Sequence, residues 1–176
     1  MDEISLQRLE KLHPKIKDKA ITAYKHVTTN LFGKRVRLRI AYGVRTKEEQ
    51  TALFAQGRTV LFDAKGKRLG KVTNAQWWQT MHFYGLAFDI VVLYDVDNNG
   101  TFEVASWDLV KDLDEDGKAD WREAIDYLKS QGFEWGGDWK FKDAPHFQMV
   151  FNHSWKELYA KYLKKDFITG TYYVNI

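Results

Sequence analysis

The chain has 176 residues, which is enough for one domain with a sizeable core and leaves little room for a second. It contains no cysteine, so disulfides and thiolate metal ligands are excluded, and a transition-metal site would need histidine and carboxylate ligands. The net charge of +3 conceals an asymmetry, since residues 1–71 carry 17 Lys/Arg against 7 Asp/Glu, whereas residues 95–126 carry 3 against 11.

The basic first half suits an anionic polymer, but a solvated basic face explains the charge equally well, and no nucleic-acid motif accompanies it. Residues 1–5 have neither a basic nor an apolar leader segment, and no run of residues suits a transmembrane helix. We therefore expect a soluble protein, made in the cytoplasm without a signal peptide and without stable membrane insertion. We also expect a monomer and no nucleic-acid partner.

Apolar residues keep helical spacing over residues 5–29, and Pro14 interrupts the pattern and should begin a second helix. Residues 36–40 alternate apolar and basic side chains, which predicts a half-buried strand. Thr46 and Glu49 form a capping-box pattern that opens a helix ending at Gly57. Residues 58–80 then predict a long loop, whose Trp77 and Trp78 either line a groove or pack in the core.

Residues 88–94 form an apolar run that predicts a strand carrying Asp89. With His82 and His146, Asp89 makes a three-ligand set for a zinc ion that keeps its fourth position for water. His82 and Asp89 can reach one ion only if the chain folds back between them, and Gly85 permits that turn. A lone histidine is more often structural than a metal ligand. The zinc interpretation therefore rests on the three residues together and not on any one of them.

His146 leads into residues 147–151, which read as a buried strand. Asp143 precedes it by three residues, and Pro145 biases Ala144 towards an extended conformation. This spacing would place the Asp143 carboxylate beside the metal without making it a ligand. That is the position a general base needs.

Three blocks occur in a recognisable order: Gly43-Val44-Arg45-Thr46, then His82-x-x-Gly85-x-Ala87-x-Asp89, then residues 135–139 (Trp-Gly-Gly-Asp-Trp) with Asp143-x-x-His146. Together they resemble the zinc peptidoglycan peptidases, which comprise L-alanyl-D-glutamate endopeptidases of phage endolysins and bacterial wall hydrolases and the related D-alanyl-D-alanine carboxypeptidases. The resemblance covers roughly residues 5–150.

The resemblance implies zinc-dependent hydrolysis of a peptide bond in the peptidoglycan stem, with Zn2+ on His82, Asp89 and His146 and Asp143 as the base. It also implies that Arg45 binds the substrate or stabilises the oxyanion, although most arginines are surface residues, and that Thr80 and Trp135 contact the substrate. The Asp143-x-x-His146 motif favours the endopeptidase branch of the family. An enzyme of this kind acts on the cell wall after release by a separate lysis step.

An acidic segment matches the calcium loop of an EF-hand at every signature position, with Gly117 at the turn and a helix expected from Trp121 to Ser130. The predicted Ca2+ ligands are Asp112, Asp114, Asp116, Lys118, Asp120 and Glu123. A second calcium candidate begins the same pattern with Asp95, Asp97 and Asn99, but Ser106 stands where the closing glutamate belongs, so an Asx-rich turn without an ion is the alternative.

We expect an α+β fold in one domain, residues 1–176: a small, mostly antiparallel sheet with flanking helices, like the D-alanyl-D-alanine carboxypeptidases, and an inserted calcium segment at 95–131. Residues 155–163 predict an amphipathic helix, and residues 171–176 have β-forming composition. Alternatives to the endopeptidase are a D-alanyl-D-alanine carboxypeptidase and a non-catalytic, calcium-dependent wall-binding module of the same fold.

Overall fold

The computed structural model describes every residue from Met1 to Ile176 and divides the chain into two compact units. Unit 1 comprises residues 1–43 and 87–149, and unit 2 comprises residues 44–86 and 150–176. The acidic segment 95–131 lies wholly in unit 1. That the chain acts as a single domain stays a prediction.

Unit 1 contains a five-stranded antiparallel sheet. Its strands are β1 (Val36–Tyr42), β2 (Ala87–Tyr94), β3 (Val104–Ser106), β4 (Glu134–Trp135) and β5 (His146–Gln148). The strand order is β1-β2-β5-β4, and β3 pairs with the C-terminal end of β2. β2 is therefore the central strand, and seven of its eight residues are buried, which explains its continuous apolar sequence.

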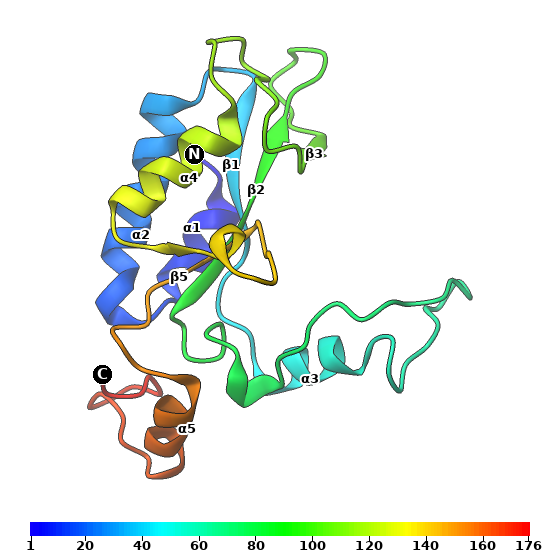
Figure 1. The fold of residues 1–176 in the computed structure, drawn as a ribbon. Coiled ribbons are helices and arrows are strands. Elements are labelled where there is room, and N and C mark those ends of the chain that lie inside the picture. The colour runs from blue at the N-terminus through cyan, green and yellow to red at the C-terminus, as the bar shows by residue number, and fades with distance from the viewer. The chain divides into compact units, whose positions relative to one another are not determined.

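Helices α1 (Glu3–Glu10), α2 (Pro14–His26) and α4 (Asp120–Ser130) lie on one side of the β1–β2 pair (Figure 1). Their apolar faces and the inward side chains of the sheet form the core of unit 1. The largest fully buried members of that core are Trp121, Tyr24, Phe88, Phe147, Leu9, Leu12, Ile16, Leu38, Ile40, Ile90 and Ile125. The α+β class with a small antiparallel sheet is confirmed.

Local sequence signals set the helix starts in unit 1. Asp2 caps α1 by accepting from the Ser5 N–H, and its carboxylate also pairs with Arg39 of β1 at 2.9 Å. Pro14 is the first residue of α2, as predicted, and the buried His13 ring accepts from the Lys15 N–H. A single π-helical turn, Val27–Leu31, then leads towards β1.

Unit 2 contains α3 (Lys47–Ala55), the short 3-10 helix η2 (Trp77–Gln79) and α5 (Trp155–Leu163). The Thr46–Glu49 capping box is present in both directions, and Gly57 takes a φ of +67° just after α3. Residues 58–76 form the predicted long loop (Figure 1). None of the helices in the chain combines the length and the apolarity needed to cross a bilayer.

Two expectations for the last third of the chain were wrong. The strand predicted over residues 147–151 ends at Gln148, and further along Phe151 and Asn152 adopt left-handed φ angles of +50° and +62°, which are incompatible with a strand reaching residue 151. Residues 171–176 form no strand despite their composition. Their one ladder contact is an isolated bridge between Phe167 and Val174.

Candidate metal centre and acidic loops

Asp89 and His146 are directly opposed on neighbouring strands of unit 1. Their Cα atoms are register partners in the β2–β5 ladder, and both residues are buried. The His146 Nδ1 and Asp89 Oδ1 atoms lie 3.2 Å apart, and the other ring nitrogen, Nε2, lies 3.1 Å from Gln148 Oε1. The sheet register therefore fixes a carboxylate and an imidazole beside each other, as predicted from two motifs 57 residues apart.

This pair fits a zinc ion. Two donor atoms that each lie about 2.0–2.1 Å from a tetrahedral zinc are roughly 3.3 Å apart. The observed 3.2 Å between Nδ1 of His146 and Oδ1 of Asp89 is close to that separation. A nitrogen and an oxygen donor also suit zinc, and their burial would shield the ion from bulk water.

His82 lies in unit 2 on a tight reversal of the chain and is 2% exposed. The Gly85 N–H donates to the His82 carbonyl, the Leu86 N–H donates to the Met81 carbonyl, and Gly85 has a φ of +70°. The predicted turn at Gly85 is thus confirmed. His82, Asp89 and His146 are each buried, and their two imidazoles and one carboxylate are donor types that zinc accepts.

The Trp-Gly-Gly segment, residues 135–137, holds the backbone of Asp143 in place. The Asp143 N–H donates to the Gly136 carbonyl at 3.0 Å, and the His146 N–H donates to the Asp143 carbonyl at 3.1 Å. A Cβ atom at Gly136 would collide with the backbone oxygen of Asp143, so only glycine allows this approach. Asp143 itself is exposed, and its role as the base stays a prediction.

Asp138, a second carboxylate in the 135–139 block, is the next candidate for the base and has a different environment. Its carboxylate forms an ion pair with Lys129 at 2.6 Å, which ties it to α4. Trp135, expected to contact substrate, is 8% exposed and donates its indole N–H to the Ala144 carbonyl at 2.7 Å. The structure therefore gives Trp135 a role in holding the loop that precedes His146, and a substrate contact stays a prediction.

Arg45 lies in unit 2 beside the His82 turn. Its backbone N–H donates to the His82 carbonyl at 3.2 Å, and its guanidinium lies 3.4 Å from the buried Gln50 amide oxygen. Gln50 in turn donates to the Ala75 carbonyl at 2.9 Å. Thr80 is also buried, and its hydroxyl accepts from the His82 N–H at 3.4 Å. These contacts fix the orientation of the His82 segment.

The acidic loop 112–123 has the backbone that its motif predicts. Gly117, at the turn position, has a φ of +94°. Both carboxylate oxygens of Asp112 accept backbone N–H groups of the loop, including that of Gly117 at 2.8 Å. Asp112, Asp114 and Asp116 form a second group that could hold a cation, and α4 begins at Asp120, one residue before the predicted start.

Three carboxylate oxygens of this loop are buried without a hydrogen-bond partner: Oδ1 of Asp114, Oδ1 of Asp120 and Oε2 of Glu123. Burial raises the pKa of all three groups, and neighbouring carboxylates add to the effect. For Asp120, which is fully buried, the pKa rises to about 6. The loop therefore holds more negative charge than its own donors neutralise.

Lys118 supplies part of the missing positive charge. Its ammonium lies 3.4 Å from Glu123 Oε1 and 3.9 Å from Asp116 Oδ2, while its side chain is 67% exposed. The predicted ligand from this residue is its backbone carbonyl, so the side chain is free to move aside when a cation binds.

The loop 95–106 has the same conformation in its first half. Asn98 and Gly100 have positive φ angles, as Glu115 and Gly117 do, and Asp95 accepts from the Asn99 and Gly100 N–H groups. Asp97 and Glu103 complete a carboxylate group there. None of these oxygens is buried without a partner, however, which is the difference between the two loops.

Comparison with known proteins agrees with this site. A family model described as D-alanyl-D-alanine carboxypeptidase matches residues 73–149, which contain all three candidate metal ligands and Asp143. The chain is also similar to the peptidoglycan L-alanyl-D-glutamate endopeptidase CwlK of Bacillus subtilis strain 168. The two are 39% identical over 142 residues, which cover 80% of this chain and 75% of the relative.

Proposed function

Because the chain belongs to the peptidoglycan metallopeptidase family that unites the D-alanyl-D-alanine carboxypeptidases and the L-alanyl-D-glutamate endopeptidases, we propose that it hydrolyses the L-alanyl-D-glutamate bond of the peptidoglycan stem. The similarity to an endopeptidase over most of both chains carries the proposal. The burial of His82, Asp89 and His146 and the 3.2 Å between His146 Nδ1 and Asp89 Oδ1 support it, because these donors suit the zinc ion on which the family depends. Its place of action is then the cell wall.

The three ligands would be His82, Asp89 and His146. A bound zinc acidifies water and polarises a carbonyl oxygen, which are the two demands of amide hydrolysis. Asp143 is the residue that takes the proton from the attacking water and passes it to the leaving amine, since it is exposed and anchored to the His146 backbone. Arg45 donates to the substrate carbonyl oxygen as negative charge develops there.

The proposal is tested by digesting purified cell walls and identifying the new termini. An L-alanyl-D-glutamate endopeptidase exposes the amino group of D-glutamate, whereas a D-alanyl-D-alanine carboxypeptidase releases free D-alanine. New glutamate amino termini that require Asp143 would support the proposal. Release of D-alanine alone would assign the other branch, and wall binding without any new terminus would identify a non-catalytic module.

We also propose that the loop 112–123 binds one calcium ion. The three unpartnered oxygens, on Asp114, Asp120 and Glu123, support the proposal because a buried carboxylate oxygen without a partner is costly unless a cation neutralises it. Asp112, Asp116 and the Lys118 carbonyl complete the oxygen shell that the motif prescribes. The 95–106 loop has no such oxygens, and we propose no ion for Asp95, Asp97 and Asn99.

A further inference from the structure

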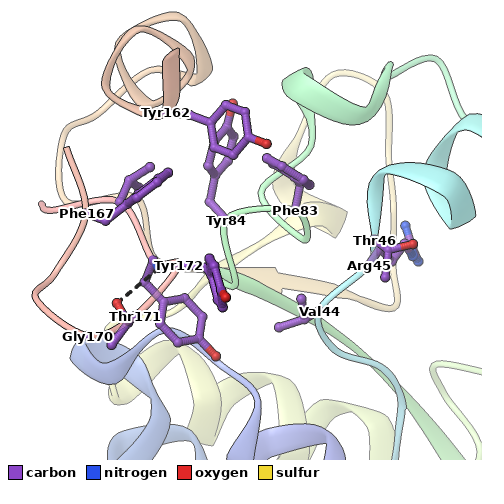
Figure 2. Close-up of a pocket in the computed structure, with 12 residues that line it drawn as sticks. Val44, Arg45, Thr46, Phe83, Tyr84, Tyr162, Phe167, Gly170, Thr171 and Tyr172 are labelled. Carbon is purple, nitrogen blue, oxygen red and sulfur yellow. Dashed lines mark hydrogen bonds between the residues drawn. The ribbon is translucent and has the colours of Figure 1, made fainter. Parts of the chain in front are cut away.

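Unit 2 contains a cavity of about 620 Å³. Of the site residues predicted from the sequence, Arg45 alone lines it. Pockets of about 300–1,000 Å³ hold drug-sized ligands, so this one is larger than a single amino-acid side chain requires. Figure 2 shows aromatic side chains from the two halves of unit 2 around it, with Arg45 and Thr46 at the side nearest α3. The aromatic members are Phe83, Tyr84, Tyr162, Phe167, Tyr172 and Tyr173.

The inner wall of the cavity is held in place by other rings. The Tyr84 hydroxyl donates to the Trp78 carbonyl at 2.7 Å, and burial raises the Tyr84 pKa, so this phenol stays neutral. Tyr162 packs edge-on against Phe83 and Phe167, with ring centroids 5.2 and 5.8 Å apart. Because these rings brace one another, the cavity does not depend on a ligand to form.

The outer wall is a loop of the C-terminal segment. The bridge between Phe167 and Val174 closes it, and the Thr171 N–H and hydroxyl both contact the Ile168 carbonyl. Tyr172 is one of the lining residues (Figure 2) and is 93% exposed, so its ring does not pack into the core. An aromatic ring in such a position is available to a ligand.

The cavity adjoins the proposed catalytic residues along the chain. Phe83 and Tyr84 directly follow His82, and Arg45 both lines the cavity and donates its backbone N–H to the His82 carbonyl. Arg45 therefore connects the cavity to the segment that bears His82. The cavity contains no carboxylate, so it does not suit the cationic side chain of a diamino acid further along a peptidoglycan stem.

We infer that this cavity is a glycan subsite that binds the N-acetylated amino sugar of the substrate. The inference rests on the proposed function: L-alanine in the peptidoglycan stem is joined to the lactyl group of N-acetylmuramic acid, so a sugar lies one residue from the bond that is cut. A sugar presents apolar C–H faces and an acetyl methyl group to aromatic rings, and its hydroxyls suit phenols. Neutral rings with one guanidinium match that neutral, polar ligand.

The test compares two substrates with the same scissile bond, N-acetylmuramyl-L-alanyl-D-isoglutamine and N-acetyl-L-alanyl-D-isoglutamine. The wild type should have a kcat/KM at least tenfold higher for the muramyl substrate, and Tyr172→Ala should reduce that ratio at least fivefold. Phe62→Ala, which removes an exposed ring from unit 2 outside the cavity, should leave the ratio unchanged. Equal ratios in wild type and Tyr172→Ala would overturn the inference.

A binding measurement separates this inference from the proposed function. N-acetylmuramyl-L-alanine contains no L-alanyl-D-glutamate bond, and its binding can be followed by ligand-observed NMR in the wild type and in Tyr172→Ala. If neither dipeptide substrate is cut, the proposed function fails, while binding that is weakened at least fivefold in Tyr172→Ala would still support the subsite. If the wild type does not bind the muramyl probe, the subsite fails whatever bond the enzyme cleaves.

Discussion

Calcium should stabilise the folded chain through the 112–123 loop. At a hundredfold excess over its dissociation constant, a ligand that binds only the folded state adds about 2.7 kcal/mol to the free energy of unfolding. For a chain of this length that corresponds to an increase in Tm of about 5–10 °C. The increase should vanish in Glu123→Gln, which replaces the bidentate closing carboxylate with a neutral amide and keeps its size.

The assay is thermal unfolding at buffered free calcium, with zinc held saturating and a calcium-selective chelator for the calcium-free state. Asp126→Asn is the matched control, since Asp126 is an exposed carboxylate of α4 outside the loop. Its calcium-dependent increase in Tm should equal that of the wild type. A wild-type Tm that does not change with calcium, or an undiminished increase in Glu123→Gln, would refute the site.

The same loop predicts how the calcium effect depends on pH. In the calcium-free protein Asp120 has a pKa of about 6 against an ordinary value of 3.8, so the folded state binds its proton more tightly than the unfolded state. That contribution to stability is fully present below about pH 4 and is lost as the pH rises to about 6. Calcium takes over the neutralising role, so its increase in Tm should be larger at pH 7 than at pH 5. An equal increase at both pH values would contradict this linkage.

Three further predictions concern the rest of unit 1. Asp143→Asn should slow wall hydrolysis by about 10²-fold or more with zinc content unchanged, and a wild-type rate would move the base to Asp138. Gly136→Ala should lower the free energy of unfolding by about 1–3 kcal/mol and abolish most of the activity, because its methyl group meets the Asp143 backbone. Gly70→Ala, whose methyl group would lie in open space, should change neither stability nor activity. Asp2→Ala should lower the free energy of unfolding at pH 7 by at least about 1 kcal/mol, through the lost cap of α1. Burial raises the pKa of Asp2, but hydrogen bonds from Arg39 and Ser5 outweigh it and lower the pKa. In urea titrations the stability difference between wild type and Asp2→Ala should therefore shrink as the pH falls below about 4. An undiminished difference at pH 2 would contradict this prediction.

Local signals predicted most of the elements because each acts over a few residues. Pro14 starts α2, Thr46 and Glu49 cap α3, and the apolar run over residues 88–94 lies in the buried central strand β2. The metal site was predictable for a different reason: Asp89 and His146 lie in motifs whose spacing resembles a known family. In the structure, the register of β2 and β5 places His146 Nδ1 3.2 Å from Asp89 Oδ1.

Features that depend on contacts distant in sequence were missed. The apolar composition of residues 147–151 predicted a longer strand, but Phe151 and Asn152 adopt left-handed angles that β propensity does not predict. The aromatic cavity joins residues about 80 positions apart, so no local pattern outlines it. Only the concentration of tyrosines over residues 159–173 could have indicated it.

The most direct test of the central claim is zinc titration of the metal-stripped protein with hydrolysis of an L-alanyl-D-glutamate peptide as the readout, at saturating calcium. Activity should rise with added zinc and reach its plateau at one zinc per chain, and His146→Ala should neither retain the ion nor regain activity. Full activity without zinc, or stoichiometric zinc and full activity in His146→Ala, would contradict the account of this chain as a zinc peptidase built on Asp89 and His146.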